Sequence, residues 1–425
     1  MIKIFDLNTM TLEEILDRTE EGTVDVTDIV AGIIDTVRQK GDQALLEYAK
    51  KFDKADLNNL VVTQEEIDEA LAQIDPYFIE TLKQARDNIQ LYHEKQLRTG
   101  YEIQKEDGIV LGQKVTPLAR VGVYVPGGTA SYPSSVLMNV IPAKIAGVGE
   151  IVMVTPPDNQ GKVAAPILAA ASVAGVTKIV KTGGAQAVAA LAYGTESVPR
   201  VDKIVGPGNA FVATAKRMVF GQVDIDMIAG PSEILVLADG TCNPSFVAAD
   251  LLSQAEHDKM AQAVLVTDSA DLAAKVADEL EVQLSQLPRE EIARTSIENR
   301  GKIIVAGSLE QAIEAANAIA PEHLELCVDE PFALLPLVKN AGSVFLGKHT
   351  PEAMGDYFAG TNHILPTGGT ARFSSPLSVD DFVKKSSYLY YTPEALAKVK
   401  DRVADFAERE GLHAHGKSVT IRFEE

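Results

Sequence analysis

The segment that decides the fold begins with Val121-Gly-Val-Tyr-Val-Pro-Gly-Gly128. A run rich in β-branched residues that stops at Pro-Gly-Gly is typical of a strand that ends in a turn before a helix. Beyond this segment, short β-rich runs alternate with alanine-rich helical stretches, which predicts βαβ units and a parallel sheet. The expected strands are 121–125, 151–155, 178–182, 203–205 and 224–228, and the expected helices lie near 135–145, 164–174, 185–193 and 211–219.

The same alternation repeats after Gly230-Pro-Ser232. The expected strands of this second array are 234–238, 263–267, 302–305, 324–328 and 343–346, and its helices lie near 244–256, 272–285, 309–318 and 331–338. The sequence therefore predicts an α/β protein with two incomplete Rossmann-like, doubly wound lobes.

The segments outside these arrays have other patterns. The first hundred residues are expected to be mainly helical, with a capping box at Thr63-Gln-Glu-Glu66. A hairpin is expected across Asp107-Gly108. The C-terminal tail combines an amphipathic helix near 393–410 with a strand candidate at 418–423. Such a tail cannot bury its apolar face alone, so we expect it to dock on the body or on a partner subunit.

These patterns give expected domain boundaries. Residues 1–22 form an N-terminal arm, and residues 23–120 together with 233–377 form a first α/β lobe that carries metal and catalytic residues. Residues 121–232 form a second α/β lobe with nucleotide-binding turns, and residues 378–425 form a dimerisation tail.

The composition excludes several classes of protein. The 425 residues are 46% hydrophobic and 23% charged, which is typical of globular proteins, and the net charge of −21 argues against nucleic acid or an anionic membrane as a partner. Two cysteines do not indicate a disulfide framework. Neither a signal peptide nor a membrane-spanning run is recognisable, so a cytoplasmic location is expected.

Two glycine-rich turns follow expected strands of the first array. They read Lys181-Thr-Gly-Gly-Ala-Gln186 and Val205-Gly-Pro-Gly-Asn209. Glycines at the carboxyl edge of a parallel sheet expose N–H groups that suit a phosphate. Neither turn contains G-x-G-x-x-G, so the pattern alone leaves ordinary tight turns as an alternative.

Five of the seven histidines fall in three further segments, which is the main indication of a site. Gln254 and His257 are three residues apart and are expected to share a helix face, and Glu322-His323 precedes an expected strand. The third set comprises the loop of Asp356 and His363 and a tail that holds Glu410, His413 and His415. Amide, carboxylate and imidazole groups suit Zn²⁺ and, less typically, Mn²⁺, and the Glu-His pair suits proton transfer.

From the residues alone, three classes of function stay open. A metal-dependent hydrolase or lyase would use the same ligands, but it has no need of the two glycine-rich turns. A non-catalytic binder of metal or of a histidine-like ligand would suit two lobes, but it leaves the Glu322-His323 pair without a role. The third class, a two-lobed α/β enzyme with a metal and two proton-transfer residues, uses the Glu-His pair, and the residues alone do not name its substrate.

Taken together and in this order, the motifs resemble those of histidinol dehydrogenase over essentially the whole chain. They are Val-Tyr-Val-Pro-Gly-Gly, Gly-Gly-Ala-Gln-Ala, Gly-Pro-Gly-Asn, Ala-Gly-Pro-Ser-Glu, Ser-Gln-Ala-Glu-His-Asp, Ala-Pro-Glu-His-Leu, Gly-Asp-Tyr with Gly-Thr-Asn-His, and the terminal Ala-His. The resemblance implies a homodimer that performs the last step of histidine biosynthesis. It implies a two-step, four-electron oxidation of L-histidinol through L-histidinaldehyde to L-histidine, with NAD and one Zn²⁺ per subunit.

The resemblance also implies a role for particular residues. Glu322 and His323 would transfer protons, and His415 rather than His413 would be the tail's zinc ligand, supplied to the partner subunit. The full zinc set would be Gln254, His257, Asp356 and His415, and the NAD contacts would be Tyr124, Gln186 and Asn209. The substrate contacts would be Ser232, Gln254, His257, His323, Asp356, His363, Glu410 and His415.

Overall fold

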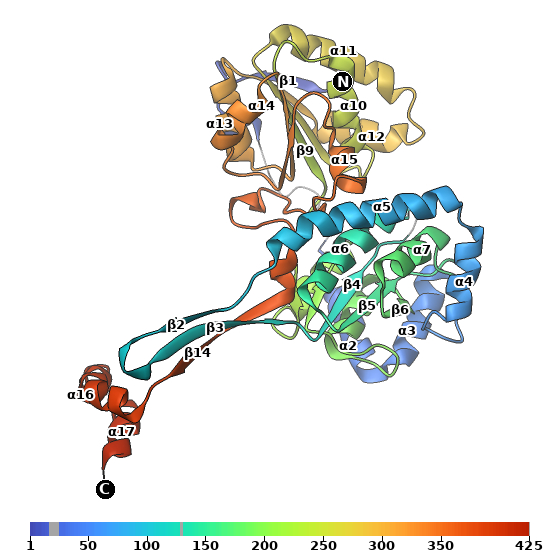
Figure 1. Ribbon diagram of the computed structural model, residues 1–425. Coiled ribbons are helices and arrows are strands. Elements are labelled where there is room, and N and C mark those ends of the chain that lie inside the picture. Colours follow the sequence, from blue (N-terminus) through green and yellow to red (C-terminus); the bar gives the residue numbers. More distant parts are fainter. Residues whose placement is uncertain (17–24, 128–130, 425) are drawn as a thin grey trace. The chain divides into compact units, whose positions relative to one another are not determined.

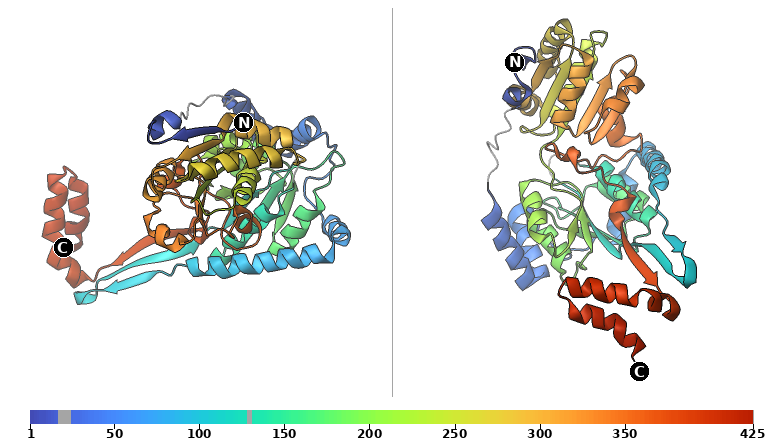
Figure 2. Two further views of the ribbon diagram at one scale, coloured as in Figure 1. Left: turned by 90° about the horizontal axis from the view of Figure 1, so that it is seen from above. Right: turned by 90° about the vertical axis from the view of Figure 1, so that its left-hand side faces the viewer.

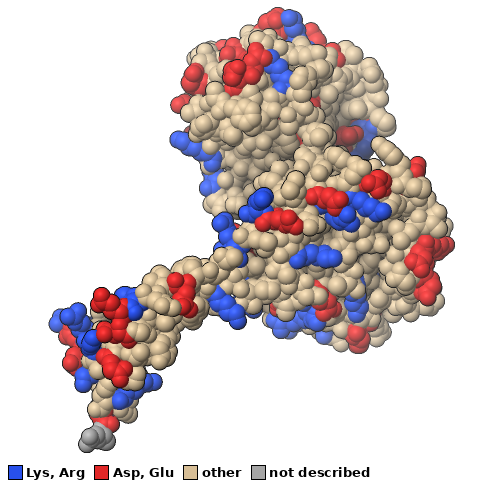
Figure 3. Space-filling view, viewed as in Figure 1, with Lys and Arg blue, Asp and Glu red and all other residues tan. Residues whose placement is uncertain are grey.

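The computed structural model describes residues 1–16, 25–127 and 131–424. These residues form two compact units. The larger unit comprises Met1–Gln96 and Leu118–Phe382, and the smaller unit comprises Leu97–Pro117 and Val383–Glu425. No helix of the described residues is long and apolar enough to span a membrane. Figure 3 shows one face of the larger unit, on which acidic and basic side chains are mixed along the helix α5 (Pro76–His93).

One sheet of the larger unit has six parallel strands, in the order β1-β11-β10-β9-β12-β13. The strands are β1 (Lys3–Asp6), β9 (Glu233–Ala238), β10 (Gln262–Thr267), β11 (Lys302–Val305), β12 (His323–Cys327) and β13 (Ser343–Leu346). The helices of this six-stranded lobe are α10 (Pro244–Ala255), α11 (Ala270–Leu284), α12 (Glu290–Arg300), α13 (Leu309–Ile319), α14 (Pro331–Leu334) and α15 (Glu352–Tyr357).

Helices cover both faces of this sheet (Figure 1), because alternate side chains of its strands point to opposite faces. In β9, Ile234 and Val236 pack in the cluster that holds α10, α11 and α12. Leu235 and Leu237 pack in the other cluster, with α13. The burial of both faces explains why these strands are apolar throughout.

The second sheet of the larger unit has five parallel strands, in the order β6-β5-β4-β7-β8. The strands are β4 (Arg120–Tyr124), β5 (Glu150–Thr155), β6 (Lys178–Lys181), β7 (Lys203–Val205) and β8 (Asp224–Ile225). The helices that follow them are α6 (Pro133–Ala146), α7 (Ala165–Ala174), α8 (Gly184–Tyr193) and α9 (Ala210–Val219). The two expected arrays of strands are therefore confirmed.

The N-terminal helices pack on this five-stranded lobe, not on the six-stranded one, so the expected grouping of 23–120 with 233–377 is wrong. The helices concerned are α2 (Thr27–Lys40), α3 (Asp42–Tyr48), α4 (Gln64–Gln73) and α5. A physical reason is the apolar surface of α8, whose residues from Ala185 to Ala192 are all buried. A helix that is apolar all round needs cover on its outer side, and α2 and α3 provide it.

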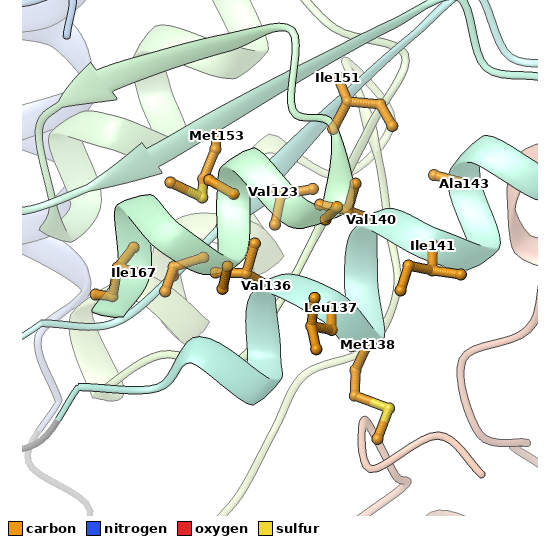
Figure 4. Packing of buried hydrophobic residues seen from close by; sticks show 14 of the residues in the cluster. Val123, Val136, Leu137, Met138, Val140, Ile141, Ala143, Ile151, Met153 and Ile167 are labelled. Carbon is orange, nitrogen blue, oxygen red and sulfur yellow. The ribbon is translucent and has the colours of Figure 1, made fainter. Parts of the chain in front are cut away.

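The other face of the five-stranded lobe is covered in the same way. Val136, Leu137 and Val140 of α6 pack with Val123 and Met153 of the strands, as Figure 4 shows. Helices α4 and α5 complete this cluster. The capping box expected at residue 63 is confirmed, because the Thr63 hydroxyl accepts from the Glu66 amide and the Glu66 side chain reaches back to residue 63.

The expected N-terminal arm also needs correction. Its first residues form β1, which pairs in parallel with β11 at the edge of the six-stranded sheet. The part of the arm at 17–22 lies outside the described residues.

The smaller unit contains a three-stranded antiparallel sheet in the order β14-β3-β2. Its strands are β2 (Tyr101–Gln104), β3 (Val110–Pro117) and β14 (Val383–Tyr390), so the expected hairpin is confirmed. The helices α16 (Pro393–Arg409) and α17 (His413–Thr420) follow and lie side by side (Figure 2). The strand expected at 418–423 is wrong. Gly416 packs close to Ala404 of α16, so this segment forms a second helix against the first.

Candidate active site

Glu322 and His323 lie at the amino edge of the six-stranded sheet. His323 opens β12, beside Ile234 of β9 and Ser343 of β13. Ligand sites of doubly wound sheets usually lie at the carboxyl edge. The residue before the pair, Pro321, follows Ala320, whose φ of 51° ends α13 and turns the chain into β12.

The backbone of Glu233 holds both side chains of the pair. The Nδ1 atom of His323 lies 2.9 Å from the Glu233 carbonyl oxygen, and since a carbonyl can only accept, Nδ1 carries the proton. The Glu233 amide donates to Oε2 of Glu322 at 2.8 Å. The other ring nitrogen of His323, Nε2, is buried and has no hydrogen-bond partner among the described residues. This nitrogen is thus available to substrate.

Two carboxylates of α15 face that nitrogen. Nε2 of His323 lies 3.8 Å from Oδ1 of Asp356 and 4.0 Å from Oε1 of Glu352. The three residues could hold a cation, because one ligand atom of each lies within 4.8 Å of the others. Glu352 is not among the site residues predicted from the sequence. Its signal was its spacing, since residues four apart on a helix share a face.

These charges shift one another's pKa. Burial alone would lower the pKa of His323, but Glu322, Asp356 and Glu352 around it raise that pKa to about 10. Burial raises the pKa of Glu322 to about 7. Burial would also raise the pKa of Asp356, yet His323 and His363 hold it well below its usual range. A cation bound among these carboxylates would lower the pKa of His323 by competing for them.

Gln254 is fully buried in the last turn of α10, and neither atom of its amide group has a hydrogen-bond partner among the described residues. A buried amide without partners costs free energy, so this group indicates a ligand. The expected shared helix face with His257 is not formed, since α10 ends at Ala255 and His257 follows in a turn. Burial lowers the pKa of His257, and the opposing effect of Asp356 places the two residues in one cluster.

His363 joins the same cluster from the loop after α15. Its Nδ1 donates to the carbonyl oxygen of Asp356 at 3.1 Å, and its Nε2 lies 3.3 Å from the hydroxyl of Ser135. Burial lowers the pKa of His363. The larger unit thus gathers the residues expected for the metal and the proton transfer, apart from the tail residues.

Of the remaining expected substrate contacts, Ser232 lies at the same edge of the six-stranded sheet as the Glu322-His323 pair, and the tail residues lie in the smaller unit. Ser232 directly precedes β9, and its carbonyl accepts from the Gln262 amide. Glu410 and His415 belong to the smaller unit, where they line a cavity of about 430 Å³ with Phe406 and Leu412.

The two glycine-rich turns and the end of β4 lie at the carboxyl edge of the five-stranded sheet. Burial raises the pKa of the Tyr124 hydroxyl to about 12, and that hydroxyl accepts from the Gly184 amide at 3.0 Å. Gly206 has a φ of 109°, and a Cβ atom there would lie 2.1 Å from the Tyr124 carbonyl oxygen. The ends of β4, β6 and β7 therefore form one surface of glycines and helix N-termini.

The other two expected contacts differ in exposure. Gln186 is buried in the first turn of α8, with its side-chain oxygen next to Gly184. Asn209 is exposed, and its side-chain oxygen caps α9 by accepting from the amides of Phe211 and Val212. The cap gives Asn209 a structural role of its own beside any ligand contact. Gly128 of the first motif lies outside the described residues.

Comparisons with known proteins identify the family of this chain. The family model described as histidinol dehydrogenase matches residues 16–423. The histidinol dehydrogenase of Clostridium acetobutylicum is 56% identical over 411 residues, which cover 97% of this chain and 95% of that one. That of Syntrophotalea carbinolica is 58% identical over 416 residues, with 97% and 96% covered. The crystal structure of histidinol dehydrogenase from Elizabethkingia anophelis has a TM-score of 0.94 at 38% identity, with 99% and 98% covered. The chain therefore belongs to the histidinol dehydrogenase family.

Proposed function

We propose that the chain oxidises L-histidinol through L-histidinaldehyde to L-histidine, with NAD as hydride acceptor and one zinc ion per subunit. The family's reaction is the last step of histidine biosynthesis. The observation that carries the proposal is a buried Glu-His pair in the same lobe as the buried amide of Gln254. Among the described residues, neither Nε2 of His323 nor that amide has a hydrogen-bond partner.

The residues present fit a zinc ion. Gln254 offers an unpartnered amide oxygen, and His257 and Asp356 add the nitrogen and oxygen donors that zinc accepts. The proposed fourth ligand is the partner subunit's His415. When bound, the metal would orient the substrate through its amino and imidazole nitrogens. Besides the metal ligands, the proposed substrate contacts are Ser232, His323, His363 and the partner subunit's Glu410.

The geometry supports distinct duties for the catalytic pair. His323 is held at Nδ1, so Nε2 is the atom that takes the hydroxyl proton as the carbon gives up its hydride. Glu322 is held at Oε2, and its raised pKa of about 7 lets the carboxylate take a proton from water. As that water adds to the aldehyde, His323 returns its proton to the carbonyl oxygen. The neutral ring then takes a proton from the hydrate while the carbon gives up a second hydride. Both oxidations occur at one carbon, so one pair of residues serves both.

NAD is a co-substrate that accepts the hydride in each oxidation. We propose Tyr124, Gln186 and Asn209 as its contacts, because they surround the helix N-termini at the carboxyl edge of the five-stranded sheet. Helix N-termini and exposed backbone amides suit the pyrophosphate.

We further propose a homodimer and a cytoplasmic location. The tail helix α16 exposes Phe406, and the cavity beside it holds Glu410 and His415, which supports docking of the tail on a second copy.

The proposed location is supported by the cysteines. Cys242 and Cys327 are free thiols, as is usual in a reducing compartment.

The test is NADH formation from L-histidinol by the purified chain, before and after chelation. We expect activity that is lost on chelation and is restored by zinc. Activity that survives complete removal of metal would contradict the zinc assignment, and a zinc-loaded protein that forms no NADH would contradict the substrate.

A further inference from the structure

A buried group of carboxyls lies behind the proposed metal site. Glu325 is two residues after His323 in β12, so both side chains point to the same face of the strand. The side chain of Glu325 is 3% exposed, and Glu352 is 2% exposed. Burial raises the pKa of Glu325 well above its usual range, and the nearby Asp250 carboxyl of α10 raises it further. The proposed mechanism gives Glu325 and Asp250 no role.

Glu325 caps the helix that carries Asp356. Helix α15 begins after Pro351, which makes no side-chain cap hydrogen bond. The first amide of the helix, that of Glu352, donates instead to Oε1 of Glu325 at 2.7 Å. An acceptor is required because the first amides of a helix have no partner within it. A residue of β12 therefore sets where α15 begins.

A second contact ties α15 to α10. The Ser253 hydroxyl donates to Oε2 of Glu352 at 2.7 Å. Ser253 is the neighbour of Gln254 in α10, so this bond links the elements that carry Gln254 and Asp356. Together with the Glu325 contact, it joins β12, α10 and α15, and each of the three carries one residue of the site.

We propose that Glu325 is a positioning residue, which sets Asp356 against His323 and Gln254 for metal binding without touching metal or substrate. The inference rests on the proposed zinc site. A buried carboxyl costs free energy in a strand whose other residues are also buried. An apolar residue would pack there at lower cost, so the contribution of Glu325 is expected in the geometry of the site and not in stability.

The experiment compares E325L, which lacks the acceptor, with E325Q, which keeps an oxygen that can accept. The control is S296A, which removes a buried hydrogen bond of the same lobe, from the Ser296 hydroxyl to the Ala261 carbonyl. Each metal-free homodimer is titrated with zinc against a chromophoric chelator, and its thermal midpoint and kcat/KM are measured. Loss of a residue behind the ligands typically costs about 10- to 100-fold in metal affinity.

We expect E325L to bind zinc about 10- to 100-fold more weakly and E325Q to stay within about threefold of the wild-type protein. S296A should lower the thermal midpoint without changing zinc affinity. Should E325L fail to fold, S253A tests the same link from α10 and should weaken zinc binding by about three- to tenfold.

Three results would overturn the inference. The first is an E325L or S253A protein with wild-type zinc affinity, and the second is an E325Q protein as weak as E325L. The third is an S296A protein in which zinc affinity falls together with the thermal midpoint, because destabilisation alone would then explain the loss of zinc binding. Failure of the proposed function is distinguishable, because the wild-type protein would then bind no zinc or form no NADH in the same assays.

Discussion

One ring nitrogen of His323 is bound to a backbone carbonyl, and the other has no hydrogen-bond partner among the described residues. This arrangement sets the tautomer and directs Nε2 at the carboxylates of α15. Because the group that binds Nδ1 belongs to the backbone, we expect the ring to keep its orientation when the side chain of Glu233 is replaced.

Replacing His323 tests its role as the base. H323A should lower kcat by about 100- to 10,000-fold, the usual contribution of general acid–base catalysis. Its zinc content should stay at one ion per subunit, since His323 is not among the proposed ligands. The exposed His349 offers a matched control, and H349A should keep full turnover. An H323A protein that has lost its zinc would make His323 a ligand, in line with the carboxylates that face it.

Replacing Gln254 by leucine is expected to raise the stability of the metal-free protein and to lower its affinity for zinc. The amide of Gln254 is buried and has no hydrogen-bond partner among the described residues, so Q254L should stabilise the metal-free form by about 1–2 kcal/mol. Zinc affinity should fall by more than about 100-fold, beyond the loss typical of residues behind the ligands. Denaturant unfolding and chelator competition measure the two effects. A Q254L protein that is less stable and still binds zinc would contradict the assignment.

Asp53 gives a pH-dependent prediction away from the metal site. Burial raises its pKa from 3.8 to about 6, and its Oδ2 has no partner among the described residues. The folded pKa lies above the unfolded one, so the cost of ionising Asp53 is absent below pH 3.8 and is fully present above pH 6. D53N should thus have a higher thermal midpoint than the wild type at about pH 8, and the difference should shrink toward about pH 4. Parallel midpoints across this range would contradict the prediction.

The proposed catalytic pair is marked by a pattern in the sequence, whereas the residues that support it are not. Glu322 and His323 are adjacent, and few histidines occur elsewhere in the chain. The contact of Glu325 with the Glu352 amide joins residues 27 apart through the fold. No local pattern marks such a contact, because it depends on where α15 is placed against β12.

At the scale of elements, the proposed nucleotide surface depends on one close approach, between the turn after β7 and the end of β4. The Gly206 amide donates to Oδ2 of Asp226 at 2.7 Å, and its carbonyl accepts from the Lys216 ammonium at 3.0 Å. Lys216 and Asp226 are also a buried ion pair. These contacts hold the turn against Tyr124, where only a residue without a side chain fits.

Two glycine-to-alanine substitutions distinguish the cost of an unfavourable φ from the cost of a clash with the Tyr124 carbonyl. G206A should cost at least about 3 kcal/mol and weaken NAD binding, since it combines an unfavourable φ with a clash against the Tyr124 carbonyl. Gly221 has a φ of 97° and open space around it, so G221A should cost only about 1–2 kcal/mol. Denaturant unfolding and calorimetric titration with NAD give both quantities. Equal losses for the two variants would contradict a close approach at Gly206.

Elements were predictable where the local pattern was strong. Apolar runs at the spacing of βαβ units gave nearly all strands of both sheets. The segment at 418–423 failed because its β-branched residues suggest a strand, while packing against α16 favours a helix. Tertiary packing overrides a weak local preference in this way.

At the scale of the whole molecule, the chain places its proposed site residues in two separate units. The pattern predicted both lobes and a tail that needs a partner. It misplaced the N-terminal helices, since an apolar stripe shows that a helix is buried and not what covers it.

Subunit exchange tests whether the tail completes the site of a partner. H323A and H415A should each be nearly inactive alone. After exchange, each mixed dimer should hold one site without either substitution. Because about half of the dimers are then mixed, about a quarter of all sites should be intact, and the activity should recover to about a quarter of that of the wild type. Mixing each variant with itself is the control. No recovery, with exchange confirmed by mass, would place His415 in the site of its own subunit.

The central claim is a four-electron oxidation at a single site, and the ratio of NADH to histidine tests it most directly. Purified zinc-loaded protein is supplied with L-histidinol and excess NAD, and both products are quantified as the reaction proceeds. The account predicts two NADH for each L-histidine at every time point, with no free aldehyde accumulating. One NADH per substrate consumed, with aldehyde as the product, would contradict it.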